Sequence, residues 1–222
     1  MSYKEALDRR LKKMIKSVPK EILDTYKKAI EKLIAKHLEE QALKNGDKIP
    51  HIVLTNAIGN KTDINEVLKK GPVILTFYRG SWCPYCNLEL RLYQELLPQI
   101  KKANGTLIAI SPDLPDYSLS FSERKKLDFE ILSDIDNKIA KQFHLVFKVD
   151  KDVVDLYKRN GFELEKQQGN SHYELPIPAT YVINQKGIIV LSHVDPIYQH
   201  RMEPTLALQK IKEINDKTMN LK

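Results

Sequence analysis

The chain of 222 residues contains only two cysteines and one tryptophan, and it has no long apolar run. A helix that crosses a membrane needs roughly 20 consecutive apolar residues, so we expect no transmembrane segment. The first residues, from Met1 to Glu5, also lack the apolar core of a secretory signal. These absences favour a cytoplasmic protein, in which a cysteine pair cycles between thiol and disulfide instead of acting as a permanent cross-link.

The charge of the chain is positive and unevenly distributed. The formal net charge is +7, with 29% charged and 42% hydrophobic residues, which is ordinary for a globular protein. The basic surplus is greatest in residues 1–45, where lysines alternate with glutamates instead of aromatic residues. That alternation is typical of a solvated helix surface, so we expect no nucleic-acid partner.

Two amphipathic helices are predicted before the main domain, over residues 4–18 and 20–43. Pro19 separates them, and Asn45-Gly46 ends the second. Their apolar stripes need a partner surface, either the chain's own domain or a second copy in a homodimer. A membrane-surface role fits less well, because the stripes lack Trp and Phe. We therefore predict a helical arm over residues 1–45 and a second domain over residues 46–222.

The second domain alternates strand and helix patterns and finishes with a hairpin and a helix, which predicts a mixed α/β fold. Gly161 to Ile177 is polar and long, and we expect it to be an irregular functional loop. The remaining expected elements are strands at 52–54, 73–78, 106–110, 129–132, 145–149, 180–183 and 188–191, and helices at 63–70, 84–103, 118–127, 136–143, 151–159 and 203–214.

Both cysteines lie at the start of one predicted helix. Cys83 and Cys86 follow a buried strand and a short turn, and Pro84 suits the first helical position. Unpaired N–H groups and the helix dipole stabilise a thiolate there. Two intervening residues also allow the sulfurs to join in a small ring, so the motif predicts redox chemistry.

Three other interpretations of the pair fit less well. A zinc site would need two more ligands, but the chain has no second cysteine pair and no His-x3–5-His spacing, so we predict no metal and no cofactor. Two inert core cysteines would not explain the strand–turn–helix placement. A structural disulfide would require an exported chain.

The segment from Trp82 to Cys86, followed late in the chain by Ile177-Pro178-Ala179-Thr180, resembles the thioredoxin superfamily. Three further segments make residues 46–215 similar to peroxiredoxin-like proteins of the alkyl hydroperoxide reductase/thiol-specific antioxidant type; they are Gly46–Pro50, Ser111–Asp113 and Leu132–Asp134. The resemblance implies a thioredoxin-like fold, a mixed central sheet flanked by helices, and a cis Pro178 beside the cysteines.

The resemblance also implies an antioxidant peroxidase. Cys86 lies on the family's peroxide-attacking position, so Cys83 would resolve the resulting sulfenic acid as a disulfide. A thioredoxin- or glutaredoxin-type protein would then reduce that disulfide. With only two cysteines, an intramolecular disulfide must join Cys83 and Cys86, which excludes a dimer with crossed disulfides.

The chain departs from the family signature at three places. Arg79 replaces its proline, Cys83 replaces its threonine or serine, and Pro178-Ala179-Thr180 occupies the place of the family's active-site arginine. Two other functions therefore stay open. One is a thiol-disulfide oxidoreductase in which Cys83 attacks protein or glutathione disulfides, and the other is a redox-sensing or scaffolding module that uses the helical arm.

Several residues are candidates for supporting roles. Arg79 would lower a thiol pKa, or else form a surface ion pair. Trp82 would pack over the disulfide, or else only fill the core. Glu89 and Asp134 are candidate proton relays, although solvated acids are the more usual interpretation of such residues. His172 and His193 are candidates for neighbours of the site, although a structural role is the more usual one for a lone histidine.

Overall fold

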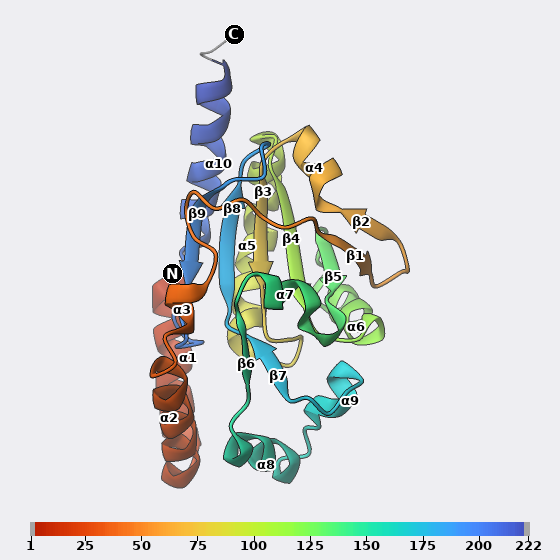
Figure 1. Ribbon diagram of the computed structural model, residues 1–222. Helices are drawn as coiled ribbons and strands as arrows, with labels where there is room; N and C mark the ends of the chain where they lie inside the picture. Colours follow the sequence, from red (N-terminus) through yellow and green to blue (C-terminus); the bar gives the residue numbers. More distant parts are fainter. Residues whose placement is uncertain (1–2, 220–222) are drawn as a thin grey trace.

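The computed structural model describes residues 3–219 and contains one central sheet with helices on both faces (Figure 1). The strands of this sheet run in the order β2-β1-β5-β4-β3-β8-β9. Their bounds are β1 Val53–Asn56, β2 Lys61–Asp63, β3 Val73–Phe77, β4 Thr106–Ser111, β5 Glu130–Ser133, β8 Ala179–Ile183 and β9 Ile189–Val194. A separate pair is formed by β6 Val146–Lys148 and β7 Glu174–Pro176.

The sheet is mixed, as predicted. β3 is parallel to β4 and β4 to β5, whereas β8 is antiparallel to both β3 and β9. All five residues of β3 are buried. Because side chains alternate along a strand, Ile74 packs on one face of the sheet and Leu75 on the other.

Two helical layers cover the sheet. Buried residues of α5, α6 and α10 form the core on one face, and those of α4 and α7 form the core on the other. The helices are α1 Tyr3–Ser17, α2 Lys20–Ile34, α3 Leu38–Gln41, α4 Ile64–Lys70, α5 Pro84–Lys102, α6 Pro115–Lys125, α7 Lys138–Gln142, α8 Lys151–Arg159, α9 Leu164–Gln168 and α10 Pro204–Met219, with a 3₁₀ turn at Ile135–Asn137.

The N-terminal helices lie against the rest of the molecule. α1 contacts α5 and α2 contacts α8, at the lower left of Figure 1. Leu7 of α1 packs on the main core, whereas Tyr26 and Ala29 of α2 pack on the cluster around α8. The division of the chain at residue 45 stays a prediction. No helix within residues 3–219 is long and apolar enough to cross a bilayer.

The second N-terminal helix is shorter than predicted. α2 ends at Ile34, and His37 adopts a left-handed conformation (φ 48°) before the short α3. The chain has to turn here because Ala42 is buried in the core beside the sheet and the Leu43 N–H donates to the Phe143 carbonyl. Helical periodicity carries no information about this tertiary constraint.

The predicted irregular loop over residues 161–177 is also wrong, because it contains α9 and β7. Its glutamines are buried rather than solvated, with Gln168 only 2% exposed. Gln167 donates to the Ser81 hydroxyl (2.9 Å) and Gln168 to the Glu174 carbonyl (2.8 Å). The polar composition thus reflects hydrogen bonds inside the molecule, one of them to the turn before Cys83.

Candidate functional site: a cysteine pair between two buried arginines

Cys83 and Cys86 lie at the start of α5, as predicted. Cys83 is the N-cap residue with an extended backbone (φ −81°, ψ 114°), and Pro84 occupies the first turn. Both residues are free thiols and almost completely buried, with exposed fractions of 1% and 0%.

The turn between β3 and α5 tolerates little change. Gly80 has φ +143°, and a Cβ there would lie 2.3 Å from Trp82 Nε1 and 2.6 Å from Asp113 Oδ1. The Ser81 N–H donates to Asp113 Oδ2 at 2.7 Å. Burial raises the pKa of Asp113 to about 6, although the hydrogen bonds from Ser81 and Gln167 oppose this. These contacts fix the position of the Cys83 backbone.

The two thiols differ in their electrostatics. Burial alone would raise the pKa of Cys83, but the hydrogen bond with Cys86 and the charges of Arg79 and Arg201 outweigh it and lower that pKa to about 5. Burial, together with the hydrogen bond to Cys83 and its charge, raises the pKa of Cys86 well above its ordinary value. The directions of the two pKa shifts favour Cys83 over Cys86 as the residue of the pair that carries the negative charge.

Arg79 is a buried cation beside Cys83, not a surface ion pair. Its side chain is only 7% exposed, and its Nη2 donates to the Tyr157 hydroxyl at 2.7 Å. The guanidinium carbon lies 4.9 Å from the centre of the Trp82 ring and 4.5 Å from that of Tyr198. Within residues 3–219, no carboxylate forms an ion pair with it.

Arg201 is the functional residue that the sequence did not reveal. Its Nη2 lies 3.3 Å from Cys86 Sγ, and its Nη1 pairs with the Glu89 carboxylate. Both side chains of that ion pair are 2% exposed. The local sequence around Arg201 carries no motif, and only the fold brings it to α5.

Glu89 is buried, so its interpretation as a solvated acid is wrong. Burial raises the pKa of its carboxyl group, while the charge of Arg201 opposes this. Thr180 on β8 donates to Glu89 Oε1 at 3.4 Å. Glu89 thus anchors Arg201 beside Cys86.

Two other candidates, Trp82 and Asp134, are held by contacts with neighbouring residues. Trp82 packs on Phe162 and Tyr157, with ring centres 4.8 Å and 5.5 Å apart, and lines the cleft beside Cys83. Asp134 is also buried and not solvated, because it accepts the backbone N–H groups of Ile139 and Ala140, each at 2.9 Å, at the start of α7.

The two candidate histidines differ in their exposure to solvent. His172 is exposed, and its ion-pair partner, at 3.9 Å, is Asp136. His193 on β9 pairs with Thr180 across the strands. Burial lowers the pKa of His193 despite the opposing charge of Asp195.

The prediction of a cis bond at Pro178 is wrong. No peptide bond within residues 3–219 is cis. The Ile177–Pro178 bond joins β7 to β8, and the Ile177 N–H donates to the Leu145 carbonyl at 2.7 Å. An extended strand-to-strand connection of this kind is compatible with the trans isomer, which X–Pro bonds generally prefer.

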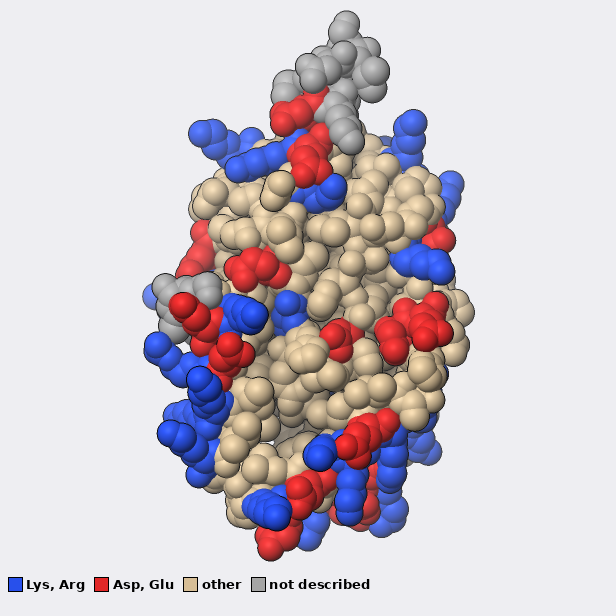
Figure 2. Space-filling view, turned by 90° about the vertical axis from the view of Figure 1, so that its left-hand side faces the viewer, with Lys and Arg blue, Asp and Glu red and all other residues tan. Residues whose placement is uncertain are grey.

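A cleft reaches the cysteine pair between the N-terminal helices and the rest of the molecule. It has a volume of about 580 Å³ and is lined by residues of α1 and α2 together with Arg79, Trp82 and Cys83. The molecular face that carries α1 and α2 is hollowed near its lower end, and Lys and Arg side chains gather along one edge of it (Figure 2). Cys83 lines the cleft, whereas Cys86 does not.

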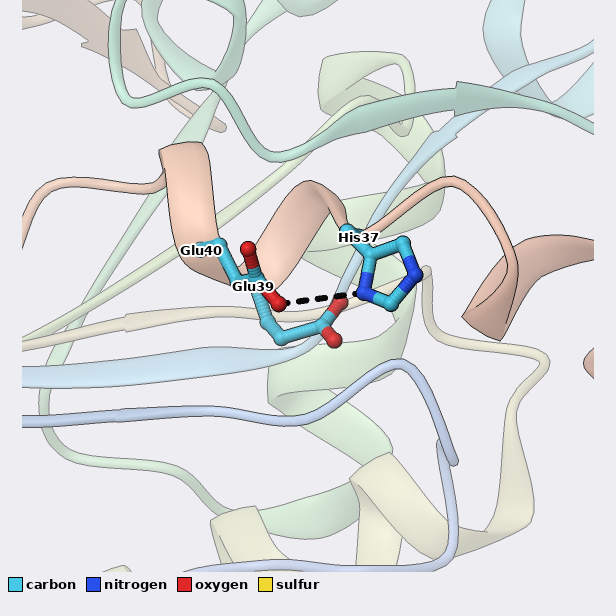
Figure 3. Close-up of side chains that lie close together, drawn as sticks. All are labelled: His37, Glu39 and Glu40. Atoms are coloured by element: carbon cyan, nitrogen blue, oxygen red, sulfur yellow. Dashed lines mark hydrogen bonds and ion pairs between the residues drawn. The ribbon is translucent and has the colours of Figure 1, made fainter.

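One group of metal-ligand residue types lies close together in the described part of the chain, namely His37, Glu39 and Glu40 (Figure 3). His37 Nδ1 is 3.0 Å from Glu40 Oε1, and both side chains are more than half exposed. An exposed ion pair accounts for this arrangement, and neither cysteine takes part in it.

Similar proteins were found among bacterial thiol enzymes. A Mycobacterium tuberculosis protein named as a peroxiredoxin is 28% identical over 101 residues, covering 46% of this chain and 66% of the relative. A Buchnera aphidicola protein of the same kind is 33% identical over 46% of this chain and 63% of its own length. The chain thus spans slightly less than two thirds of these relatives. The thiol-disulfide oxidoreductase ResA of Bacillus thuringiensis is 27% identical over 58% of this chain and 77% of the relative.

Solved structures show the same fold. The peroxidoxin BcpB of Mycobacterium tuberculosis superposes with a TM-score of 0.63 at 20% identity, covering 78% of this chain and 98% of the other. Peroxiredoxin 6 of Arenicola marina gives a TM-score of 0.63 at 18% identity, over 78% of this chain and 74% of the other. The predicted thioredoxin-like fold is confirmed. Because the AhpC/TSA family model also matches residues 45–192, which include both cysteines and all of the central sheet except the end of β9, the chain belongs to the AhpC/TSA family.

Proposed function

We propose that the protein is a thiol peroxidase that reduces hydroperoxides through a dithiol/disulfide cycle of Cys83 and Cys86. The observation that carries this proposal is the pair of sulfurs at the start of α5, with Arg79 beside one and Arg201 against the other. Membership of the AhpC/TSA family supports the same chemistry.

In the first step, the Cys83 thiolate attacks one oxygen of the peroxide. An S–O bond forms while the O–O bond breaks, the alkoxide leaves and takes up a proton as the alcohol, and Cys83 becomes a sulfenic acid. Arg79 stabilises the thiolate before the reaction and is placed to stabilise negative charge on the departing oxygen.

In the second step, the Cys86 thiol attacks the Cys83 sulfur. An S–S bond forms and the sulfenic oxygen leaves as water, taking up the Cys86 proton. Arg201 stabilises Cys86 as that proton departs, because its Nη2 lies 3.3 Å from the sulfur. A thioredoxin- or glutaredoxin-type dithiol in the cytoplasm then reduces the disulfide and restores both thiols.

This order reverses the one implied by the family signature, which assigns the attack to Cys86. Two observations support Cys83 as the attacking residue. Its pKa is lowered to about 5 while that of Cys86 is raised, and only Cys83 lines the cleft. Both the nucleophile and the entry route then lie on the Arg79 side of the pair.

The test is a single turnover of hydroperoxide with Cys83→Ser and Cys86→Ser variants. We expect Cys83→Ser to abolish peroxide consumption, and Cys86→Ser to consume one equivalent and stop at a sulfenic acid that dimedone traps on Cys83. If Cys83→Ser retains the single turnover and traps the label on Cys86, the attacking residue is Cys86. If both variants consume peroxide at the parent rate, the protein does not reduce peroxide through Cys83 and Cys86.

The Cys-x-x-Cys pair also supports a second candidate function, a thiol-disulfide oxidoreductase. A low-pKa cysteine at a helix N-terminus, followed by a high-pKa partner, suits attack on a substrate disulfide. Insulin reduction with dithiothreitol as electron donor measures this activity. Fast insulin reduction combined with slow peroxide turnover would favour the second function.

A further inference from the structure

A second cavity lies next to the cysteine cleft, between α2 and the segment that carries β6 and α8. Its volume is about 300 Å³. Apolar side chains form most of its wall; among them are Ile30, Leu33, Phe147, Val149 and Val153. The wall contributed by α2 lies outside residues 45–192, so the matched part of the chain does not build this cavity alone.

Arg79 lines both this cavity and the cysteine cleft. Its Nε is buried and has no hydrogen-bond partner. The Tyr157 hydroxyl, which accepts from Arg79, also lines the cavity and has its own proton to donate. The Cys83 thiolate faces Arg79 from the side of the cleft, and within residues 3–219 no carboxylate pairs with Arg79 from the side of the cavity.

The charged residues around the cavity are mainly basic. Lys32, Lys36 and Lys148 line it with one carboxylate, Asp150, which pairs with Lys32 at 2.7 Å. Within residues 3–219, no carboxylate lies within ion-pair distance of Lys36 or Lys148. The field around the cavity therefore favours an anionic occupant.

We propose that this cavity binds a small apolar organic anion, with its hydrocarbon chain against α2 and its carboxylate on Arg79. Apolar walls with a few convergent donors are the usual composition of a small-molecule site. The carboxylate would face the Arg79 guanidinium and accept from the Tyr157 hydroxyl, while Lys36 and Lys148 attract it electrostatically. The proposal goes beyond the peroxidase reaction and does not depend on it.

Octanoate and 1-octanol are the probes, because they share a chain length and differ in charge. Binding to the full-length wild-type protein is measured by calorimetry and by the fluorescence of Trp82, whose ring lies 4.9 Å from Arg79. We expect octanoate to bind saturably at one site and 1-octanol to bind at least about tenfold more weakly. Equal affinities for the two probes, or no saturable binding of octanoate, would overturn the proposal.

Two phenylalanine substitutions, one within α2 and one at its C-cap residue, form a matched pair that tests where octanoate binds. Ala29→Phe fills the cavity, whereas Ala35→Phe adds the same side chain at an exposed position that does not line this cavity. We expect Ala29→Phe to weaken octanoate binding about tenfold or more and Ala35→Phe to leave it unchanged. Equal affinities for the two variants would show that octanoate binds elsewhere.

A surface variant covers the case in which Ala29→Phe does not fold. Lys36→Glu changes only an exposed side chain at the cavity. We expect it to weaken octanoate binding several-fold at low salt and to have little effect on 1-octanol. An unchanged octanoate affinity would contradict the proposed electrostatic attraction.

Discussion

Two buried arginines flank the cysteine pair, and only one of them has a carboxylate partner. Arg201 pairs with Glu89 on α5 and touches Cys86, whereas Arg79 is held by aromatic rings and one tyrosine hydroxyl. The paired charge of Arg201 is largely compensated, so it serves to fix the position of the site. Arg79 has no carboxylate partner, and its charge acts on the Cys83 thiolate and on the cavity beside α2.

The largest expected effect comes from removing the paired arginine. Arg201→Met leaves the Glu89 carboxylate buried without its partner, and we expect a loss of about 3–5 kcal/mol in the free energy of unfolding. Urea denaturation of the reduced protein measures it. Arg91→Met is the control, because Arg91 is exposed and pairs only with Glu95, and it should cost no more than about 1 kcal/mol.

An intermediate effect is expected at the turn that presents Arg79 to Cys83. In Gly80→Ala the new methyl group would collide with Trp82 and Asp113 at a backbone angle that favours glycine. We expect a loss of about 1–3 kcal/mol in the free energy of unfolding, together with slower peroxide reduction. Gly161→Ala is the control, because Gly161 has φ +74° but open space around it, so this variant has the backbone strain without the collision. It should lower the free energy of unfolding by less. Equal losses in the two variants would show that the collision at Gly80 does not contribute.

The smallest effect on stability is expected for the unpaired arginine. Arg79→Met leaves no buried carboxylate behind, so the free energy of unfolding should fall by less than in Arg201→Met. Near pH 7 the expected loss is about 1.4 kcal/mol for each unit by which the pKa of Cys83 rises. If Arg79→Met lowered the free energy of unfolding as much as Arg201→Met, the carboxylate partner of Arg201 would not explain the difference expected between the two arginines.

Arg79→Met should also change the titration of Cys83. The charge of Arg79 helps to lower the pKa of Cys83 to about 5, so its removal raises that pKa. Because the thiolate is the form present above the pKa, the variant should react with peroxide more slowly near pH 6 and approach the parent rate at alkaline pH. Thiolate absorbance and single-turnover rates across pH measure both changes. An unchanged pH profile would show that Arg79 does not act on Cys83.

The parts of the fold that follow from local patterns were predictable. The buried strand β3, the helix opened by Pro84 and the Asp63 cap of α4, whose carboxylate accepts the Asn65 N–H at 2.8 Å, are each encoded within a few neighbouring residues. Hydrophobic periodicity and capping chemistry act over that range, so they located the cysteine pair correctly.

The rest of the site depends on contacts between distant parts of the chain. Arg201 lies 112 residues from Glu89, and Gln167 lies 86 residues from Ser81. Charged and polar residues are usually solvated, so sequence alone favoured exposure for Glu89 and a loop around Gln167. Burial reversed both expectations, because each group finds its partner only after the sheet and α5 have come together.

The most direct test of the Cys83–Cys86 cycle is the intact mass of the reduced protein after reaction with one equivalent of hydroperoxide. We expect each chain to lose two hydrogens and keep no oxygen, and peptide mapping to find Cys83 joined to Cys86. Two free thiols after the reaction, or a retained oxygen with no disulfide in the wild-type chain, would contradict it.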